Sequence, residues 1–240
     1  MFSPVCQRAP TATRFAEADV PTEYGVFRVV VYREPGSPFE HCAIVKGDVA
    51  GQSDVLVRVH SECLTGEVLR SLKCDCREQL ELALERIAEQ GSGAVLYLRQ
   101  EGRGIGLGNK IRAYALQERG LDTVDANRAL GFDDDLRRYH VATTMLADLG
   151  VRSVALMTNN PAKVEALIED GVVVSRRVDH YIEPHEHNES YLTTKRARMG
   201  HLFEGSACSE YGEGGNGNGK GNGASAIAPT LLAVANDDAE

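Results

Sequence analysis

Apolar residues follow two different periods along this chain. Up to residue 62, β-branched and aromatic residues form short runs separated by segments rich in Gly, Pro, Ser and Asp, a pattern typical of strands joined by turns. These runs cover residues 24–32, 41–49 and 54–62. They predict a small antiparallel sheet, or the start of a barrel, in the N-terminal part of the chain.

From residue 75 the apolar spacing changes to i, i+3, i+4 and alternates with short apolar runs. The clearest helical stretch covers 75–91 and ends at Gly91. Further helices are predicted over 110–120, 137–150 and 161–171, strands over 94–99, 153–158 and 172–178, and a loop over 121–136. This alternation predicts an α/β fold: one mixed domain over residues 21–204 with a β-rich N-terminal portion.

The two ends of the chain differ from this domain. Residues 1–20 are polar, irregular and contain proline, and we expect them to be disordered. Residues 205–240 include a Gly/Asn-rich low-complexity stretch, which predicts a disordered tail. An apolar patch over 227–235 is interpreted as part of that tail and not as a docking peptide.

Charge and hydropathy exclude several functional classes. The 240 residues carry a formal net charge of −9 without a polybasic run, which disfavours binding to nucleic acid. No apolar run approaches the ~18 residues of a membrane span, and the N-terminus lacks the pattern of a secretory signal. We therefore expect a cytoplasmic protein that binds neither membrane nor nucleic acid.

The six cysteines are too few and too unevenly spaced for a disulfide scaffold. Cys63, Cys74 and Cys76 form a C-x10-C-x-C set, and the last two lie one residue apart just before a predicted helix. Two thiolates in such a turn can chelate one ion, and three protein ligands leave a fourth position open for water, as in catalytic zinc sites. The alternative, three small buried core residues, fits poorly with the charged residues around Cys74 and Cys76.

The glycine-rich segment 99–110 lies between a predicted strand and a helix, where backbone amides can bind phosphate. It matches neither the dinucleotide-binding nor the P-loop motif, and a simple tight turn explains it equally well. Basic residues at the ends of predicted strands or in loops could bind a polyphosphate, although solvent exposure is the ordinary alternative for any single arginine. These basic residues are Arg58, Arg103, Arg128, Arg137 and Lys163.

Five ordered blocks together resemble GTP cyclohydrolase II, the enzyme that opens riboflavin biosynthesis. They cover residues 57–76, 99–117, 122–127, 130–139 and 156–167, and the likeness extends from about residue 24 to about residue 203. No dihydroxybutanone-phosphate synthase domain precedes the blocks, so we expect a monofunctional chain. The sequence departs from the family pattern at Arg77, where the family usually carries glycine.

The resemblance implies a homodimer that opens the imidazole ring of GTP and releases formate and pyrophosphate. It implies one Zn²⁺ per chain on Cys63, Cys74 and Cys76, and Mg²⁺ bound with GTP. It gives Tyr114 a role in ring opening, Asp135 the role of general base and Arg137 that of nucleophile towards the α-phosphate. The residues that it implies in GTP binding are Arg58, Val59, His60, Ser61, Glu62, Gln79, Glu101, Gly102, Arg103, Thr123, Thr158 and Lys163.

The residue types leave three alternatives open. A guanidinium group is a poor nucleophile because its pKa exceeds about 12, so Arg137 could attack covalently or stabilise charge, with Asp135 accepting its proton or orienting it. A paralogue could stop at a formamidopyrimidine or supply specialised metabolism. A non-catalytic module could instead bind GTP beside a structural zinc, with His60 as the fourth ligand.

Overall fold

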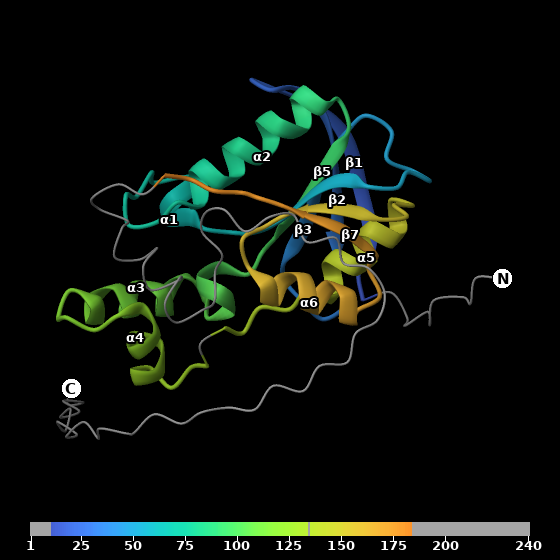
Figure 1. Cartoon of the computed structure of the whole chain (residues 1–240). Coiled ribbons are helices and arrows are strands. Elements are labelled where there is room, and N and C mark those ends of the chain that lie inside the picture. The colour runs from blue at the N-terminus through green and yellow to red at the C-terminus, as the bar shows by residue number, and fades with distance from the viewer. Residues whose placement is uncertain (1–10, 134, 184–240) are drawn as a thin grey trace, which may run out of the picture.

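A seven-stranded mixed sheet forms the centre of the computed structural model, which describes residues 11–133 and 135–183 (Figure 1). The strand order is β1-β2-β3-β5-β4-β6-β7. The strands are β1 (Thr13–Thr22), β2 (Gly25–Arg33), β3 (Glu40–Lys46), β4 (Val55–Ser61), β5 (Gly93–Leu98), β6 (Val154–Met157) and β7 (Val174–Val178). The predicted mixed α/β class is confirmed.

The sheet changes from antiparallel to parallel at β5. Strands β1, β2, β3 and β5 pair antiparallel, whereas β5, β4, β6 and β7 pair parallel. The predicted antiparallel start is therefore confirmed for β2 and β3 and wrong for β4. The physical reason is burial, because six of the seven β4 residues are buried, and strands buried on both faces are typical of parallel sheets.

Helices cover both faces of the sheet (Figure 1). Helix α2 (Cys76–Gln90) packs Ala83 and Ile87 against Leu56 of β4. On the opposite face, α5 (His140–Asp148) and α6 (Pro161–Glu169) form the second core with Val57 and Val59. Because side chains alternate along a strand, Arg58 and His60 share the α2 face with Leu56.

Two short helical elements and two further helices lie beyond the strand ends. They are α1 (Leu64–Glu67), η1 (Glu101–Gly104), α3 (Gly106–Gln117) and α4 (Thr123–Ala129). The predicted loop over 121–136 is wrong for the residues of α4. Asp122 caps this helix by accepting hydrogen bonds from the backbone N–H groups of Val124 and Asp125, 2.8 Å in each case.

The N-terminal boundary also differs from the prediction. Residues 13–20 belong to β1, which pairs with β2 along its length, so the expected disorder of residues 1–20 is wrong there. All ten β1 residues are exposed, and an edge strand that buries neither face has no need of the alternating pattern that reveals most strands. The predicted tail and its apolar patch lie outside the described residues. No helix in the described ranges has the length and apolar character needed to cross a bilayer.

Candidate active site

Three cysteines meet where β4 leads into α1 and where the following loop enters α2. Cys63 precedes α1, Cys74 lies in the loop, and Cys76 is the first residue of α2. Their sulfur atoms all lie within 4.8 Å of one another, and the Cys63 and Cys74 sulfurs are 3.6 Å apart. The structure thus brings together the set that the sequence spacing selects.

Gly66 of α1 allows this close approach. A Cβ atom at Gly66 would lie 2.9 Å from the Cys74 sulfur and 3.2 Å from the Cys63 sulfur. Any larger residue would push into the cluster, so the glycine is required by packing and not by its backbone angles.

The surroundings favour the thiolate form of Cys63 over those of Cys74 and Cys76. Hydrogen bonds from the Cys74 and Cys76 thiols, with further help from Lys110, lower the pKa of Cys63. Hydrogen bonding to Cys63 in turn raises the pKa of Cys74 to about 11, and that of Cys76 is raised as well. A divalent cation would compensate the charge of three neighbouring thiolates. Soft sulfur donors at this separation fit a thiolate-binding metal ion.

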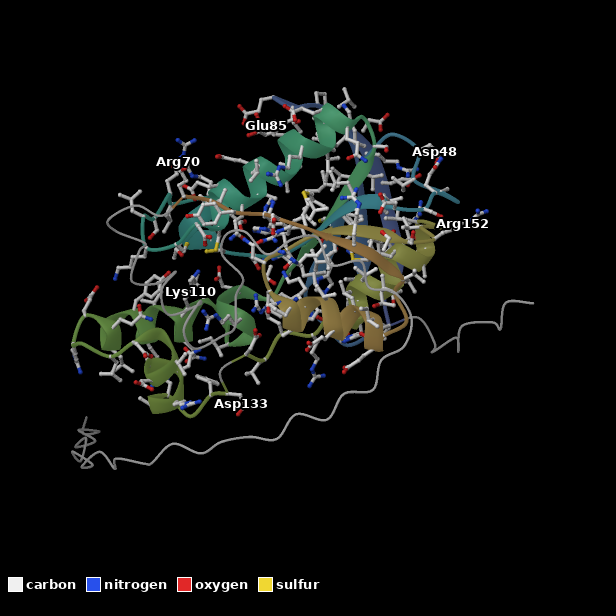
Figure 2. All side chains as sticks on the ribbon, in the orientation of Figure 1. Asp48, Arg70, Glu85, Lys110, Asp133 and Arg152 are labelled. Atoms are coloured by element: carbon white, nitrogen blue, oxygen red, sulfur yellow. The ribbon has the colours of Figure 1, made fainter. Side chains whose placement is uncertain are left out.

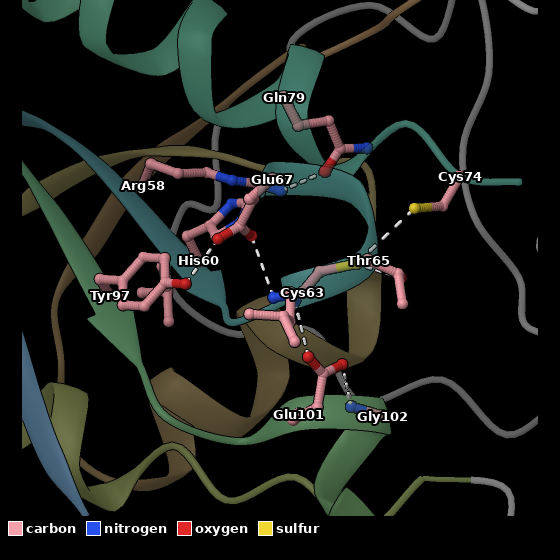
Figure 3. Close-up of polar contacts among 12 residues, drawn as sticks. Arg58, His60, Cys63, Thr65, Glu67, Cys74, Gln79, Tyr97, Glu101 and Gly102 are labelled. Atoms are coloured by element: carbon pink, nitrogen blue, oxygen red, sulfur yellow. Dashed lines mark hydrogen bonds and ion pairs between the residues drawn. The ribbon is translucent and has the colours of Figure 1, made fainter. Parts of the chain in front are cut away.

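Glu101 connects the cluster to η1 and α3. One carboxylate oxygen accepts from the backbone N–H of Leu64 at 2.6 Å, and the other accepts from the N–H of Gly102 at 2.8 Å (Figure 3). The second oxygen also accepts from Nζ of Lys110 at 2.8 Å. Lys110 Nζ also lies 3.1 Å from the Cys63 sulfur. Figure 2 shows Lys110 on the side of α3 that faces α2. Sequence reasoning missed Lys110, because its partners lie in distant segments and no local motif includes it.

A second buried carboxylate, Glu67, lies on the other side of Cys63. It accepts hydrogen bonds from the Cys63 backbone N–H at 3.0 Å and from the Tyr97 hydroxyl at 2.5 Å, and contacts His60 Nε2 at 2.8 Å (Figure 3). Burial raises the pKa of Glu67 to about 7. Among the described residues the group of ligating atoms within 4.8 Å of one another contains the three cysteines and not His60, so the structure does not support His60 as a fourth cluster ligand. Sequence reasoning missed both Glu67 and Tyr97.

A chain of polar contacts runs from β4 to the cysteine turn. Arg58 donates to the carbonyl of Met157 at 2.9 Å and to the side-chain oxygen of Gln79. Gln79 then donates from its amide to Asp75 at 2.6 Å. Burial lowers the pKa of Arg58 to about 10, which still leaves its guanidinium charged at neutral pH.

A cavity adjoins this chain at the carboxyl ends of β4, β6 and β7, the edge where α/β sheets bind ligands. Its walls include the cations Arg58, Arg103, Arg137 and Lys163. The other predicted residues that line it are His60, Ser61, Cys76, Gln79 and Thr158. Asp75, Asn159, Asn160 and His180 also line it and were missed by sequence reasoning, whereas Arg128 is not among the lining residues.

Lys163 shows how the fold positions these groups. It lies in the first turn of α6, which begins with Pro161 and is capped by the Asn160 side chain accepting from the N–H of Ala162 at 3.1 Å. Its ammonium group is buried and donates to the carbonyl of Val59 at 2.7 Å. Val59 therefore contributes its backbone oxygen to this site.

Arg137 and Asp135 form an ion pair at the cavity. Arg137 Nε donates to both carboxylate oxygens of Asp135, at 2.9 and 3.1 Å, and its Nη2 contacts the same carboxylate. Burial opposes the ionisation of Asp135, but the hydrogen bonds and charge of Arg137 outweigh it and lower the pKa of Asp135. This geometry favours a charged guanidinium beside an ionised carboxylate.

Tyr114 lies on α3 beside the cysteine cluster. Its hydroxyl is 3.5 Å from Oγ1 of Thr65, which is 3.6 Å from the Cys63 sulfur. The ammonium group of Lys73 lies 4.8 Å from the centroid of the Tyr114 ring. The structure therefore places Tyr114 near the cluster and not among the lining residues of the basic cavity.

Further residues singled out in the sequence have the following positions, and only Arg103 among them lines the cavity. Glu62 pairs with Nε of Arg99 at 2.7 Å, and Thr123 begins α4. Gly102 and Arg103 both adopt left-handed backbone angles in η1, with φ of 61° and 60°. Arg77 pairs with Glu78 at 2.8 Å and Glu81 at 3.7 Å, so the charge that replaces the expected glycine is neutralised on α2 itself.

Comparisons with known proteins agree with this geometry. The sequence profile of the family described as GTP cyclohydrolase II matches residues 13–179. A GTP cyclohydrolase-2 from Enterobacter sp. (strain 638) is 54% identical over 189 residues, 79% of this chain and 96% of that protein. One from Teredinibacter turnerae is 50% identical over 188 residues, 78% and 94% of the two chains.

A longer relative matches equally well over part of its length. The riboflavin biosynthesis protein RibBA of Endomicrobium trichonymphae is 50% identical over 192 residues, which are 80% of this chain and 48% of that protein. The chain thus spans about half the length of this relative and nearly all of the two described above.

Proposed function

This chain belongs to the GTP cyclohydrolase II family of hydrolases, and on that premise we propose that it converts GTP to 2,5-diamino-6-ribosylamino-4(3H)-pyrimidinone 5′-phosphate, formate and pyrophosphate, the first step of riboflavin biosynthesis. The cysteine triad beside a cavity walled by four cations carries the proposal, because ring opening and phosphate cleavage need these two environments side by side.

Cys63, Cys74 and Cys76 would hold one Zn²⁺. Three thiolates satisfy three of the four positions that zinc prefers, and the donor set is soft, as zinc sites are. When bound, zinc supplies a Lewis acid that makes water nucleophilic near neutral pH. Lys110 and Glu101 hold the Cys63 thiolate in place, and Glu67 fixes the backbone of the same residue.

Ring opening requires water to add at C8 of guanine and the formyl carbon then to leave as formate. Tyr114 reaches the cluster through Thr65, and we assign its hydroxyl the task of hydrogen bonding to the opening ring. The alternative is that Tyr114 has only a packing role on α3. It predicts that formate release is unchanged when the hydroxyl is removed.

The basic cavity would hold the triphosphate. Arg58 and Lys163 are fixed by backbone carbonyls, so their charges are oriented before a ligand arrives. Mg²⁺ bound with GTP would neutralise part of the charge on the leaving pyrophosphate. Arg103 adds a further cation from the left-handed turn of η1, and the turn itself does not require a charged side chain.

For Arg137 the ion pair with Asp135 supports charge stabilisation over covalent attack. A guanidinium that donates to both oxygens of one carboxylate is held in its charged form, and a charged guanidinium has no free electron pair. We therefore assign Arg137 to the α-phosphate as a cation and Asp135 to its orientation.

A combined metal and product assay tests this function. Purified protein should contain one zinc per chain and release formate and pyrophosphate in equal amounts from GTP. Cys74→Ser should lose zinc and formate release together. Pyrophosphate or an opened ring without formate would instead indicate the paralogue, and tight GTP binding without turnover would indicate a non-catalytic module.

Two further properties complete the proposal. The three thiols require a reducing compartment to stay free for a metal, which supports a cytoplasmic enzyme. The family resemblance supports a homodimer, and light scattering of the purified chain would test it. A monomeric active enzyme would remove the dimer from the proposal without affecting the chemistry.

A further inference from the structure

His180 is held rigidly in the wall of the basic cavity. It follows β7 and is buried, with 1% of its surface exposed. Its backbone N–H donates to the side-chain oxygen of Asn159 at 3.0 Å, and its carbonyl accepts from the Asn159 amide at 2.9 Å. Its ring Nε2 lies 2.7 Å from the backbone carbonyl of Gln79. Asn159 therefore fixes the backbone of His180, and the Gln79 carbonyl fixes its ring.

These contacts define which ring nitrogen carries the proton. A carbonyl oxygen only accepts hydrogen bonds, so Nε2 must be the donor and Nδ1 of the neutral ring is a bare acceptor. Burial, reinforced by the charge of Arg58, lowers the pKa of His180 to about 2, so the ring stays neutral throughout the physiological range. Nδ1 is buried and has no hydrogen-bond partner among the described residues.

An acceptor without a partner is unusual in a folded protein, where buried polar atoms are nearly always paired. His180 lines the same cavity as Arg58, whose buried Nε likewise has no partner in the described part of the chain. The wall thus offers the His180 acceptor and the Arg58 donor to whatever fills the cavity, together with His60 Nδ1 and Ser61 Oγ, which are also buried without a partner in the described ranges. Ionised phosphates bring only acceptors, whereas a nucleoside also brings N–H and O–H donors.

We propose that His180 is a specificity-determining residue whose Nδ1 accepts a hydrogen bond from an N–H or O–H donor of the nucleoside part of the substrate. The Gln79 carbonyl and Asn159 act as its positioning groups by fixing the ring and its tautomer. This inference rests on the proposed function, because it takes GTP as the ligand of the cavity. It predicts that the site reads the nucleoside and not only its phosphates.

Two substitutions at His180 separate the role of the Nδ1 acceptor from that of the hydrogen bond between Nε2 and the Gln79 carbonyl. His180→Gln can keep a donor to the Gln79 carbonyl but loses the acceptor at the Nδ1 position. His180→Asn keeps an acceptor at that position and loses the hydrogen bond to the Gln79 carbonyl. Affinity is measured by calorimetry with the α,β-methylene analogue of GTP. We expect the Gln variant to bind about tenfold more weakly, as for one lost hydrogen bond, and the Asn variant to retain more affinity than Gln.

The donor is identified with triphosphates that lack the 2-amino group, the N1–H, the 2′-hydroxyl or the 3′-hydroxyl. One of these should bind wild-type protein about tenfold more weakly than GTP, and His180→Gln should bind that nucleotide and GTP alike. Equal weakening of every nucleotide by His180→Gln would overturn the proposal, since the ring would then act only through Gln79. Unchanged affinity would also overturn it and would indicate a buried water at Nδ1.

Two controls keep the outcome interpretable. If His180→Gln fails to fold, the wild-type series decides, because equal affinity for GTP and all four analogues excludes a donor contact. His41 is a buried histidine on β3 outside the cavity, and His41→Gln should leave the nucleotide preferences unchanged. Failure of the proposed function is separate, because wild-type protein would then neither bind GTP nor release formate.

Discussion

The ammonium nitrogen of Lys110 lies 3.1 Å from the sulfur of Cys63, although the two residues are 47 positions apart. The same ammonium pairs with Glu101 at 2.8 Å, and only 12% of the Lys110 side chain is exposed. Burial disfavours its charge, but Glu101 and Cys63 outweigh this effect and raise the pKa of Lys110. The Lys110 cation therefore stabilises the Cys63 thiolate in the cysteine cluster.

We expect Lys110→Met to weaken zinc binding by roughly 10- to 100-fold, the range typical of groups that support metal ligands. The methionine has similar length but no charge, so the Cys63 thiolate loses its compensating cation. Competition with a chromophoric chelator measures the affinity. Lys110→Arg keeps the charge and should fall between wild type and Lys110→Met; unchanged affinity in Lys110→Met would show that the contact is incidental.

Gly66→Ala should disturb the cluster without disturbing its helix. The added Cβ would lie 2.9 Å from the Cys74 sulfur, and overpacking of this kind costs about 1–3 kcal/mol. Zinc affinity in the same competition assay should fall about tenfold. Gly108→Ala on α3 is the matched control, because nothing lies within 4 Å of its Cβ position. It should keep zinc affinity and gain about 0.5–1 kcal/mol of stability in urea unfolding.

Arg137→Ala should reduce pyrophosphate release by about 100-fold or more, the loss typical of one preorganised charge at a reacting centre. Far-ultraviolet circular dichroism should be unchanged, because the Arg137–Asp135 pair lies at the cavity and not in either core. Arg138→Ala, at an exposed neighbour, should keep wild-type release. GTP radiolabelled at the α-phosphate should leave no label on protein quenched during turnover; labelled protein would contradict the charge-stabilising role.

Acid should destabilise the fold partly through His180. Its pKa is lowered to about 2 in the folded chain, whereas the unfolded histidine takes up a proton below about 6.5. Between these values only the unfolded state binds that proton, so stability falls as pH falls, by about 1.4 kcal/mol per pH unit once the unfolded histidine is fully protonated. Urea unfolding of wild type and His180→Gln between pH 7 and about pH 5 measures this loss of stability. The free energy of unfolding of the variant should fall less steeply with decreasing pH.

Local sequence patterns predicted the elements that depend on near neighbours. The i, i+3, i+4 spacing with Gly91 located α2, and Pro161 located the start of α6. Short apolar runs located β5 and β6. Each of these signals acts within one or two turns of chain, where propensity, capping and amphipathic burial operate. The cysteine spacing belongs with them, because two of the three thiols share a single turn.

The same patterns failed where the outcome depends on strand pairing. β1 buries neither face and exists because β2 pairs with it. β4 pairs with β5 and β6, both later in the chain, although its sequence resembles the strands that precede it. Composition alone cannot encode such pairings, because strand order is decided by how the helices cover the two faces of the sheet.

The sequence by itself determined the α/β class, the cysteine set and the four cations at the cavity. Only the tertiary structure decided that the Lys110 cation lies beside the Cys63 sulfur and that Glu67 contacts His60. It also decided that Nδ1 of His180 is buried without a hydrogen-bond partner in the described part of the chain. The physical reason is range. Helices and turns arise from contacts within a few residues. The ionisation of buried charges and the hydrogen bonding of buried acceptors depend instead on groups that packing brings together from distant segments.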